Sequence, residues 1–162
     1  MKAKELGLIE PALSGAIELE FKFPGINFTS GRRTMFSQAK AMAQNVLEDR
    51  NWIRVTYRSH PVTDACQAFV DAHPDATMED LFNGFLGVMN SYTDAQLASW
   101  SHHLAGLAFD VEPETERGDA IKTEIRNLPG LNLFLEREGN LLRWHAQFNP
   151  LPSGGHNDGL QS

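Results

Sequence analysis

Apolar and polar residues alternate in five short runs of the chain, and an alternating pattern predicts half-buried β-strands. The runs are residues 16–23, 26–29, 104–111, 131–137 and 141–148, and the short run 26–29 could be a strand or a turn. The last two runs flank Glu138, Gly139 and Asn140, a turn composition that predicts a β-hairpin.

Other segments repeat their apolar residues every three or four positions, which is the spacing of amphipathic helices. These segments are residues 35–51, residues 62–72, a segment that starts at Thr77, residues 93–100 and residues 114–128. Thr34 and Thr77 suit the N-cap position because a threonine hydroxyl can accept a hydrogen bond from a free backbone N–H. The elements together predict an α+β fold, in which a small antiparallel sheet carries the candidate site and the middle helices cover one face.

The length of 162 residues and a hydrophobic content of 41% fit one domain with a well-formed core. We expect that domain to cover residues 1–150. Residues 151–162 are rich in Gly, Pro and Ser, which predicts a disordered tail. No run of 18 apolar residues exists, so we expect no membrane span, and residues 1–16 lack the apolar stretch of a signal peptide. We expect a monomer.

The net charge of −7 argues against a general nucleic-acid binder, because contacts to phosphate need Lys and Arg. Residues 1–58 nevertheless hold nine Lys and Arg against six Asp and Glu, and a basic spot surrounds Arg32 and Arg33. The single cysteine, Cys66, excludes an internal disulfide framework and a multi-cysteine zinc cluster. The chemistry must therefore come from other side chains.

The strongest candidate site combines two histidines and an aspartate. His103 lies at the start of the run 104–111, and Asp110 follows on the face that also carries Gly106 and Ala108. These small residues leave room beside the backbone for a metal ion. His145, on the last predicted strand, is the natural third ligand. Two histidines and one carboxylate would leave a coordination position open, as catalytic metal sites do.

The segment from Ser101 to Asp110 has the pattern S-x-H-x-x-G-x-A-x-D, and Trp144 and His145 follow near the C-terminal end. This pattern resembles the zinc D-Ala-D-Ala carboxypeptidase family, which includes phage L-alanyl-D-glutamate endopeptidases and is similar in its metal site to hedgehog and lysostaphin-type proteins. The family also shows S-G-Y-R-S/T with a glutamine five residues after the arginine. Here residues 30–34 and Gln38 match that motif, with Arg32 in place of the aromatic residue.

The resemblance covers about residues 26–148 and implies roles for six residues. His103, Asp110 and His145 would bind Zn²⁺. Arg33 would polarise the scissile carbonyl or hold a substrate carboxylate, Ser101 would support the site or contact the substrate, and Gln38 would orient neighbouring groups. The implied activity is hydrolysis of peptidoglycan stem or cross-link peptides by an endolysin-like enzyme. Such an enzyme would stay in the host cytoplasm until release or belong to a virion.

One family position is different in this chain. The family keeps its general base, a glutamate, three residues before the last histidine, and that position is Leu142 here. If the hairpin turns at Gly139 and Asn140, Glu136 lies on the same face as His145, so we expect Glu136 to serve as the base. Glu136 could instead pair only with Arg143. Glu138, at the expected turn, is the other candidate, ahead of Glu112 and Glu114.

Three hypotheses follow. The first is a zinc peptidase of the cell wall. The second, motivated by Leu142, is a degenerate noncatalytic member that binds metal and recognises cell wall or peptide, or that serves as a phage structural component. The third is a helical structural module in which the His and Asp residues coincide by chance. The sequence leaves open which bond is cut and whether the enzyme is an exopeptidase or an endopeptidase.

Overall fold

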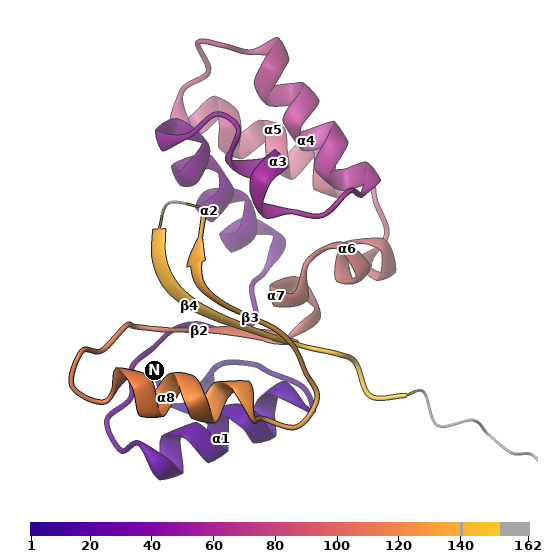
Figure 1. Ribbon diagram of the computed structural model, residues 1–162. Coiled ribbons are helices and arrows are strands. Elements are labelled where there is room, and N and C mark those ends of the chain that lie inside the picture. The colour runs from indigo at the N-terminus through magenta and orange to yellow at the C-terminus, as the bar shows by residue number, and fades with distance from the viewer. Residues whose placement is uncertain (140, 153–162) are drawn as a thin grey trace, which may run out of the picture.

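The computed structural model describes residues 1–139 and 141–152, and in this part of the chain four strands form one antiparallel sheet in the order β1-β2-β4-β3 (Figure 1). The strands are β1 (Phe28–Ser30), β2 (Ala108–Val111), β3 (Leu131–Glu138) and β4 (Leu141–Phe148). The helices are η1 (Ala3–Glu5), α1 (Ala12–Lys22), α2 (Met35–Glu48), α3 (Trp52–Thr56), α4 (Pro61–Ala72), α5 (Met78–Asn90), α6 (Asp94–Trp100), α7 (His102–Ala105) and α8 (Gly118–Arg126). The predicted α+β class is confirmed.

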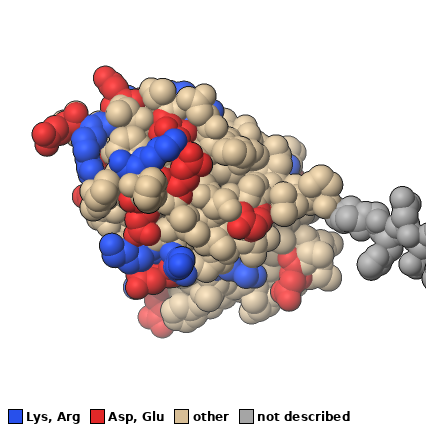
Figure 2. Space-filling view, turned by 90° about the horizontal axis from the view of Figure 1, so that it is seen from below, with Lys and Arg blue, Asp and Glu red and all other residues tan. Residues whose placement is uncertain are grey.

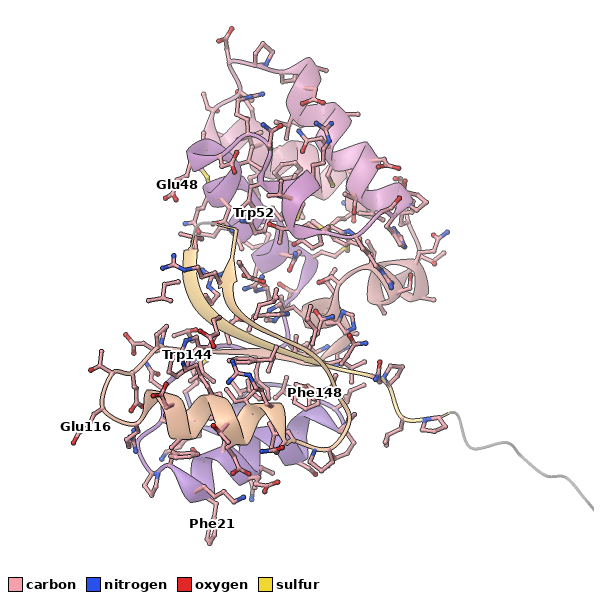
Figure 3. All side chains as sticks on the ribbon, in the orientation of Figure 1. Phe21, Glu48, Trp52, Glu116, Trp144 and Phe148 are labelled. Carbon is pink, nitrogen blue, oxygen red and sulfur yellow. The ribbon has the colours of Figure 1, made fainter. Side chains whose placement is uncertain are left out.

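One face of the sheet packs against α1 and α8. Phe109 from β2 and Trp144 and Phe148 from β4 are buried in this layer, together with Leu19 of α1 and Ile121 of α8. Trp144 and Phe148 lie between the strands and α8 in Figure 3. Alternate residues of β2 and β4 therefore form the main core, and the residues between them point to the opposite face.

Helices α2 to α6 form a second buried cluster on the other side of the sheet (Figure 1). Its largest buried side chains include Met42, Ile53, Leu81 and Phe85. Helices α1 and α8 occupy the apolar face of the sheet. The middle helices instead stand above the polar face, where the candidate metal ligands lie.

The predicted strand at residues 16–23 is wrong, because this segment belongs to α1. Ile17 and Phe21, half of the alternating pattern, are 38% and 85% exposed. The buried residues Ala12, Ala16 and Leu19 follow helical spacing instead. Exposed apolar side chains produced an apparent period of two.

The run 104–111 is only partly a strand. Residues His102–Ala105 form the single turn of α7, which ends at Gly106 with φ of +76°, a left-handed conformation that favours glycine. The strand β2 starts at Ala108. Gly106 therefore turns the chain from helix to strand and does not clear the face of a strand.

The other predicted elements are present, with changes at their ends. Thr34 accepts a hydrogen bond from the Ser37 N–H and Thr77 from the Asp80 N–H, as expected of N-caps. The segment 35–51 ends at Glu48 and continues as the separate helix α3, and α8 is shorter than the segment 114–128. Of the predicted tail, residues 153–162 lie outside the described residues.

The surface over α1 and α8 carries charges of both signs in close alternation (Figure 2). Lys22 pairs with Glu18 and Glu124, and Arg126 pairs with Glu136. Such exposed pairs contribute little to stability. None of the described helices is long and apolar enough to cross a membrane.

Two glycines of α5 offer a matched test of the packing in the second cluster. A Cβ atom at Gly84 would overlap the ring of Phe69 in α4, whereas a Cβ at Gly87 would meet nothing within 4 Å. We expect Gly84→Ala to lower the free energy of unfolding by about 1–3 kcal/mol through overpacking. Gly87→Ala should raise it by about 0.5–1 kcal/mol through helix propensity. Urea titrations measure both, and equal effects would contradict the close approach of α4 and α5.

Candidate metal centre

The local fold around His103 aims one ring nitrogen into the site. Ser101 caps α7 by accepting a hydrogen bond from the Leu104 N–H. The His103 Nδ1 atom lies 2.8 Å from the carbonyl oxygen of Gly31. A carbonyl oxygen only accepts, so Nδ1 carries the proton and Nε2 keeps a free lone pair. That Nε2 atom is buried and makes no hydrogen bond.

Asp110 and His145 are paired residues of neighbouring strands. Their Cα atoms face each other across β2 and β4, and both side chains point to the polar face of the sheet. Asp110 is fully buried and His145 is 5% exposed. The pairing of β2 with β4 therefore fixes two of the three candidate ligands before any metal binds.

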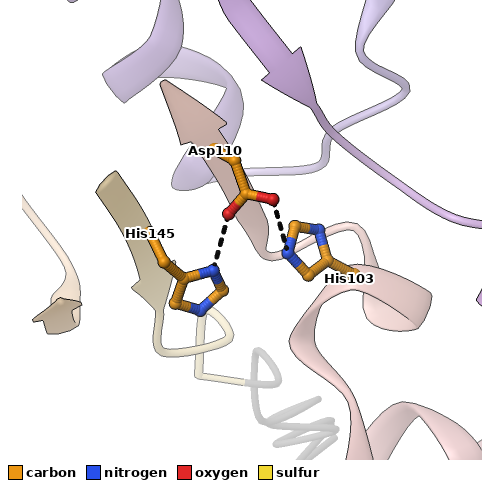
Figure 4. Close-up of side chains that lie close together, drawn as sticks. All are labelled: His103, Asp110 and His145. Carbon is orange, nitrogen blue, oxygen red and sulfur yellow. Dashed lines mark hydrogen bonds and ion pairs between the residues drawn. The ribbon is translucent and has the colours of Figure 1, made fainter. Parts of the chain in front are cut away.

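The structure brings His103, Asp110 and His145 together as the sequence predicts (Figure 4). Asp110 Oδ1 lies 2.9 Å from His145 Nδ1, and Asp110 Oδ2 lies 3.5 Å from His103 Nε2. One potential ligand atom from each residue lies within 4.8 Å of the others. This buried group could hold a metal ion. The lone pair on His103 Nε2 is available to such an ion, because no hydrogen bond from the protein uses it.

The two histidines differ in their readiness to take a proton. Burial lowers the pKa of His103, and the attraction of Asp110 only partly opposes it. Burial would also lower the pKa of His145, but the hydrogen bond and charge of Asp110, with the charge of Glu138, raise it above 6.5. His145 Nε2 also lies 3.1 Å from Gln147 Oε1, so both ring nitrogens face acceptors.

The Asp110 carboxylate is buried but keeps its charge. Burial would raise its pKa, yet the neighbouring imidazoles of His103 and His145, and the hydrogen bond from His145, together lower it below 3.8. The carboxylate is thus available as an anionic ligand at any physiological pH.

Arg33 lies beside the three residues and is held by a network of polar groups. Its Nη2 atom is 3.3 Å from Asp110 Oδ2, its Nε donates to Ser30 Oγ at 3.1 Å, and its Nη1 donates to Gln38 Oε1 at 3.4 Å. The Arg33 side chain is 15% exposed, and Gln38 is almost fully buried. The hydrogen bond to Gln38 therefore helps to orient Arg33 beside Asp110.

The structure does not bring Glu136 to the site. Glu136 is 44% exposed and pairs with Arg126 at 2.6 Å and with Lys122 at 3.6 Å, on the side of the sheet that α8 covers. The expected base is therefore misplaced, and its alternative pairing with Arg143 is not formed either. Arg143 contacts Glu138 instead.

A β-bulge explains this error. Leu135 faces His145 and Arg137 faces Leu142, so one residue of β3 lies opposite two residues of β4. The extra residue shifts the register by one, which reverses the faces of β3 beyond that point. As a result Glu136 turns toward α8.

Glu138 occupies the position expected for Glu136. Its Oε1 atom lies 3.5 Å from His145 Nδ1, its Oε2 atom accepts from Arg143 Nη1 at 3.2 Å, and its side chain is 11% exposed. Leu142 is 57% exposed and takes no part in the site. A side chain at a turn, as Glu138 is, is usually solvated. Here the end of the hairpin packs against Trp52, and this contact could not be read from the sequence.

A pocket of about 160 Å³ adjoins the candidate ligands. His103, His145, Arg33, Ser101 and Glu138 contribute to its lining. The rest of the lining includes residues of α3, of the segment after it and of α6, namely Trp52, Thr56, Tyr57, Arg58 and Trp100. The spacing of Trp52 and Tyr57 along the chain does not link them to the histidines, so the sequence pattern alone does not place them at the site.

Comparisons of the chain with protein-family models, with curated proteins and with solved structures give no significant match. The family resemblance therefore rests on the sequence motifs alone.

Adjacent histidines provide a controlled test of metal binding. We expect the protein to bind one equivalent of Zn²⁺, and His103→Ala to weaken binding about 100-fold or more because it removes the free Nε2 donor. His102→Ala should bind like the wild type, because His102 is outside the group of three. Competition with a chromophoric chelator measures the affinities. Equal losses in the two variants would contradict the assignment.

Zinc uptake should also release a proton. The raised pKa of His145 means that this ring holds a second proton more readily than a free imidazole does, and a metal must displace that proton. We expect proton release per zinc to grow toward about one as the pH falls below 6.5, and affinity that falls about tenfold per pH unit below the pKa of His145. Calorimetry in buffers of different ionisation enthalpy measures the proton, with His102→Ala as the unchanged control. Binding without proton release would show that His145 is not a ligand.

Proposed function

We propose that the protein is a zinc peptidase that hydrolyses peptide bonds in the stem or cross-link peptides of peptidoglycan. The observation that carries the proposal is the buried group of His103, Asp110 and His145, which opens on a pocket that also holds Arg33 and a carboxylate. On this proposal the protein acts at the cell wall, after release from a host cytoplasm or as part of a virion.

The donor set supports a catalytic metal. Two imidazoles and one carboxylate suit Zn²⁺ and leave a position open, although Fe²⁺ accepts the same set. The motif resemblance selects zinc between the two. When bound, zinc supplies a Lewis acid that polarises a peptide carbonyl and makes water more acidic.

We assign the general base to Glu138 in place of the absent family glutamate. Its Oε1 atom faces His145, and Arg143 holds the other oxygen, so the free oxygen is directed toward the candidate ligands. Glu138 would accept the proton of the attacking water as the oxygen adds to the carbonyl carbon. It would then return that proton to the leaving amine as the C–N bond breaks.

Arg33 supports the choice of an anionic peptide as substrate. Its guanidinium carries five N–H donors, and three of its nitrogens already bond Ser30, Gln38 and Asp110. The remaining donors can bind a carbonyl or carboxylate oxygen of the substrate. Arg58 adds a second cation to the pocket lining. Stem peptides carry free carboxylates that suit such a pocket.

Purified peptidoglycan tests the activity directly. We expect the zinc-loaded protein to release fragments with new amino and carboxyl ends, detected by mass spectrometry, and the fragment masses to distinguish an endopeptidase from a carboxypeptidase. A chelator should abolish the release, and added zinc should restore it. A folded, zinc-loaded protein that pellets with peptidoglycan but releases no ends would identify a noncatalytic binder.

The two neighbouring glutamates of β3 test the base. Glu138→Gln should lower the rate about 10²–10⁴-fold, because an amide cannot accept the proton. Its zinc affinity should stay within about tenfold of the wild type. Glu136→Gln is the matched control and should keep the wild-type rate, because Glu136 faces α8. The assignment fails if the two variants are equally active.

A further inference from the structure

We propose that Tyr57 is a substrate-binding residue whose hydroxyl donates a hydrogen bond to an oxygen of the bound peptide. The inference rests on the proposed function for the class of ligand. It assigns a role to the aromatic part of the pocket lining, which no motif of the sequence indicates.

The ring of Tyr57 is fixed by aromatic neighbours. It stacks on Trp100 with 4.6 Å between ring centroids and an interplanar angle of 26°. It also meets Trp52 edge to face, with centroids 5.6 Å apart. One stacked and one edge-to-face ring contact leave the hydroxyl little freedom of position.

Gln38 determines whether the Tyr57 hydroxyl is able to donate a hydrogen bond to a ligand. An arginine only donates, so the Gln38 Oε1 atom must face Arg33 and the Gln38 amide N–H groups must face Tyr57. The Gln38 Nε2 atom accordingly donates to the Tyr57 hydroxyl oxygen. That bond occupies the oxygen and leaves the hydroxyl proton free. Among the residues that the structure describes, no hydrogen bond donated by Tyr57 is found.

The wall around Tyr57 is rich in unpaired polar atoms. The Trp52 Nε1 and Thr56 Oγ1 atoms are buried without a hydrogen-bond partner, and Trp52 is only 5% exposed. Both residues line the same pocket as Tyr57. An indole N–H only donates, and a buried donor without an acceptor is costly. A ligand with exposed oxygen acceptors would satisfy this wall.

Other lining residues give the peptide its direction. Glu138 and the candidate ligands line the same pocket as Tyr57, and Arg33 bonds both Asp110 and Gln38. A peptide held by Tyr57 would therefore have its oxygen on the α3 side and its scissile bond toward Glu138. Burial also raises the pKa of Tyr57, which keeps the proton on the hydroxyl.

Binding of two probe peptides tests the inference apart from catalysis. The probes are N-acetyl-D-Ala-D-Ala with a free carboxylate and the same peptide as its C-terminal amide, titrated into the zinc-loaded Glu138→Gln protein. Adding Tyr57→Phe should weaken binding about three- to tenfold. A loss confined to the free acid identifies the carboxylate as the acceptor, and a loss for both peptides identifies a carbonyl.

A spectroscopic measurement avoids the risk that Tyr57→Phe disturbs the fold. The chain has two tyrosines, so Tyr92→Phe leaves Tyr57 as the only one. With tyrosine labelled by ¹³C at Cζ, this protein gives one signal, and we expect that signal to shift as the probe saturates the site. Saturable binding without a shift, unchanged affinity in Tyr57→Phe, or no binding of either probe would overturn the inference. Binding with a shift but without cleavage by the wild type would instead reject only the peptidase function.

Discussion

The buried charge of Asp110 is the constraint on which the rest of this site depends. A carboxylate with no exposure is stable only when cations or donors surround it. Here His145 and Arg33 donate to it from two other parts of the chain, and the His103 ring lies beside it. The pairing of β2 with β4, the single turn of α7 and the start of α2 must all be in place before these partners meet. The site and the fold around it therefore form together.

Both layers of the molecule serve that arrangement. On one side of the sheet, α1 and α8 bury the apolar residues of β2 and β4, which leaves the alternate residues free for chemistry. On the other side, the helical cluster contributes the aromatic wall of the pocket and Gln38, which orients Arg33. The charge of the surface over α1 and α8 has no direct part in the site, because its cations and anions pair with each other.

Local chemistry made much of this structure predictable. Threonine caps marked two helices, the turn composition marked the hairpin, and the spacing of the histidines and the aspartate identified the group that the fold assembles. Two features depended on information outside the local pattern. The exposed residues Ile17 and Phe21 gave α1 the alternating pattern of a strand, since a pattern of residue types does not say which apolar side chains are buried. The wall formed by Trp52 and Tyr57 depends on how the helical cluster docks, which no spacing along the chain encodes.

The β-bulge in the hairpin has a wider consequence for the comparison of related chains. One additional residue on β4 exchanges the faces of two glutamates that are only two positions apart on β3. An acidic residue on β3 can thus take the role of one on β4, while the candidate metal ligands and the order of the strands stay the same. Two related chains could then place the same chemical groups around the site and still carry different residues at one position of a sequence motif. Residues of such chains are better matched by the face of the sheet on which they lie than by their position in a sequence alignment.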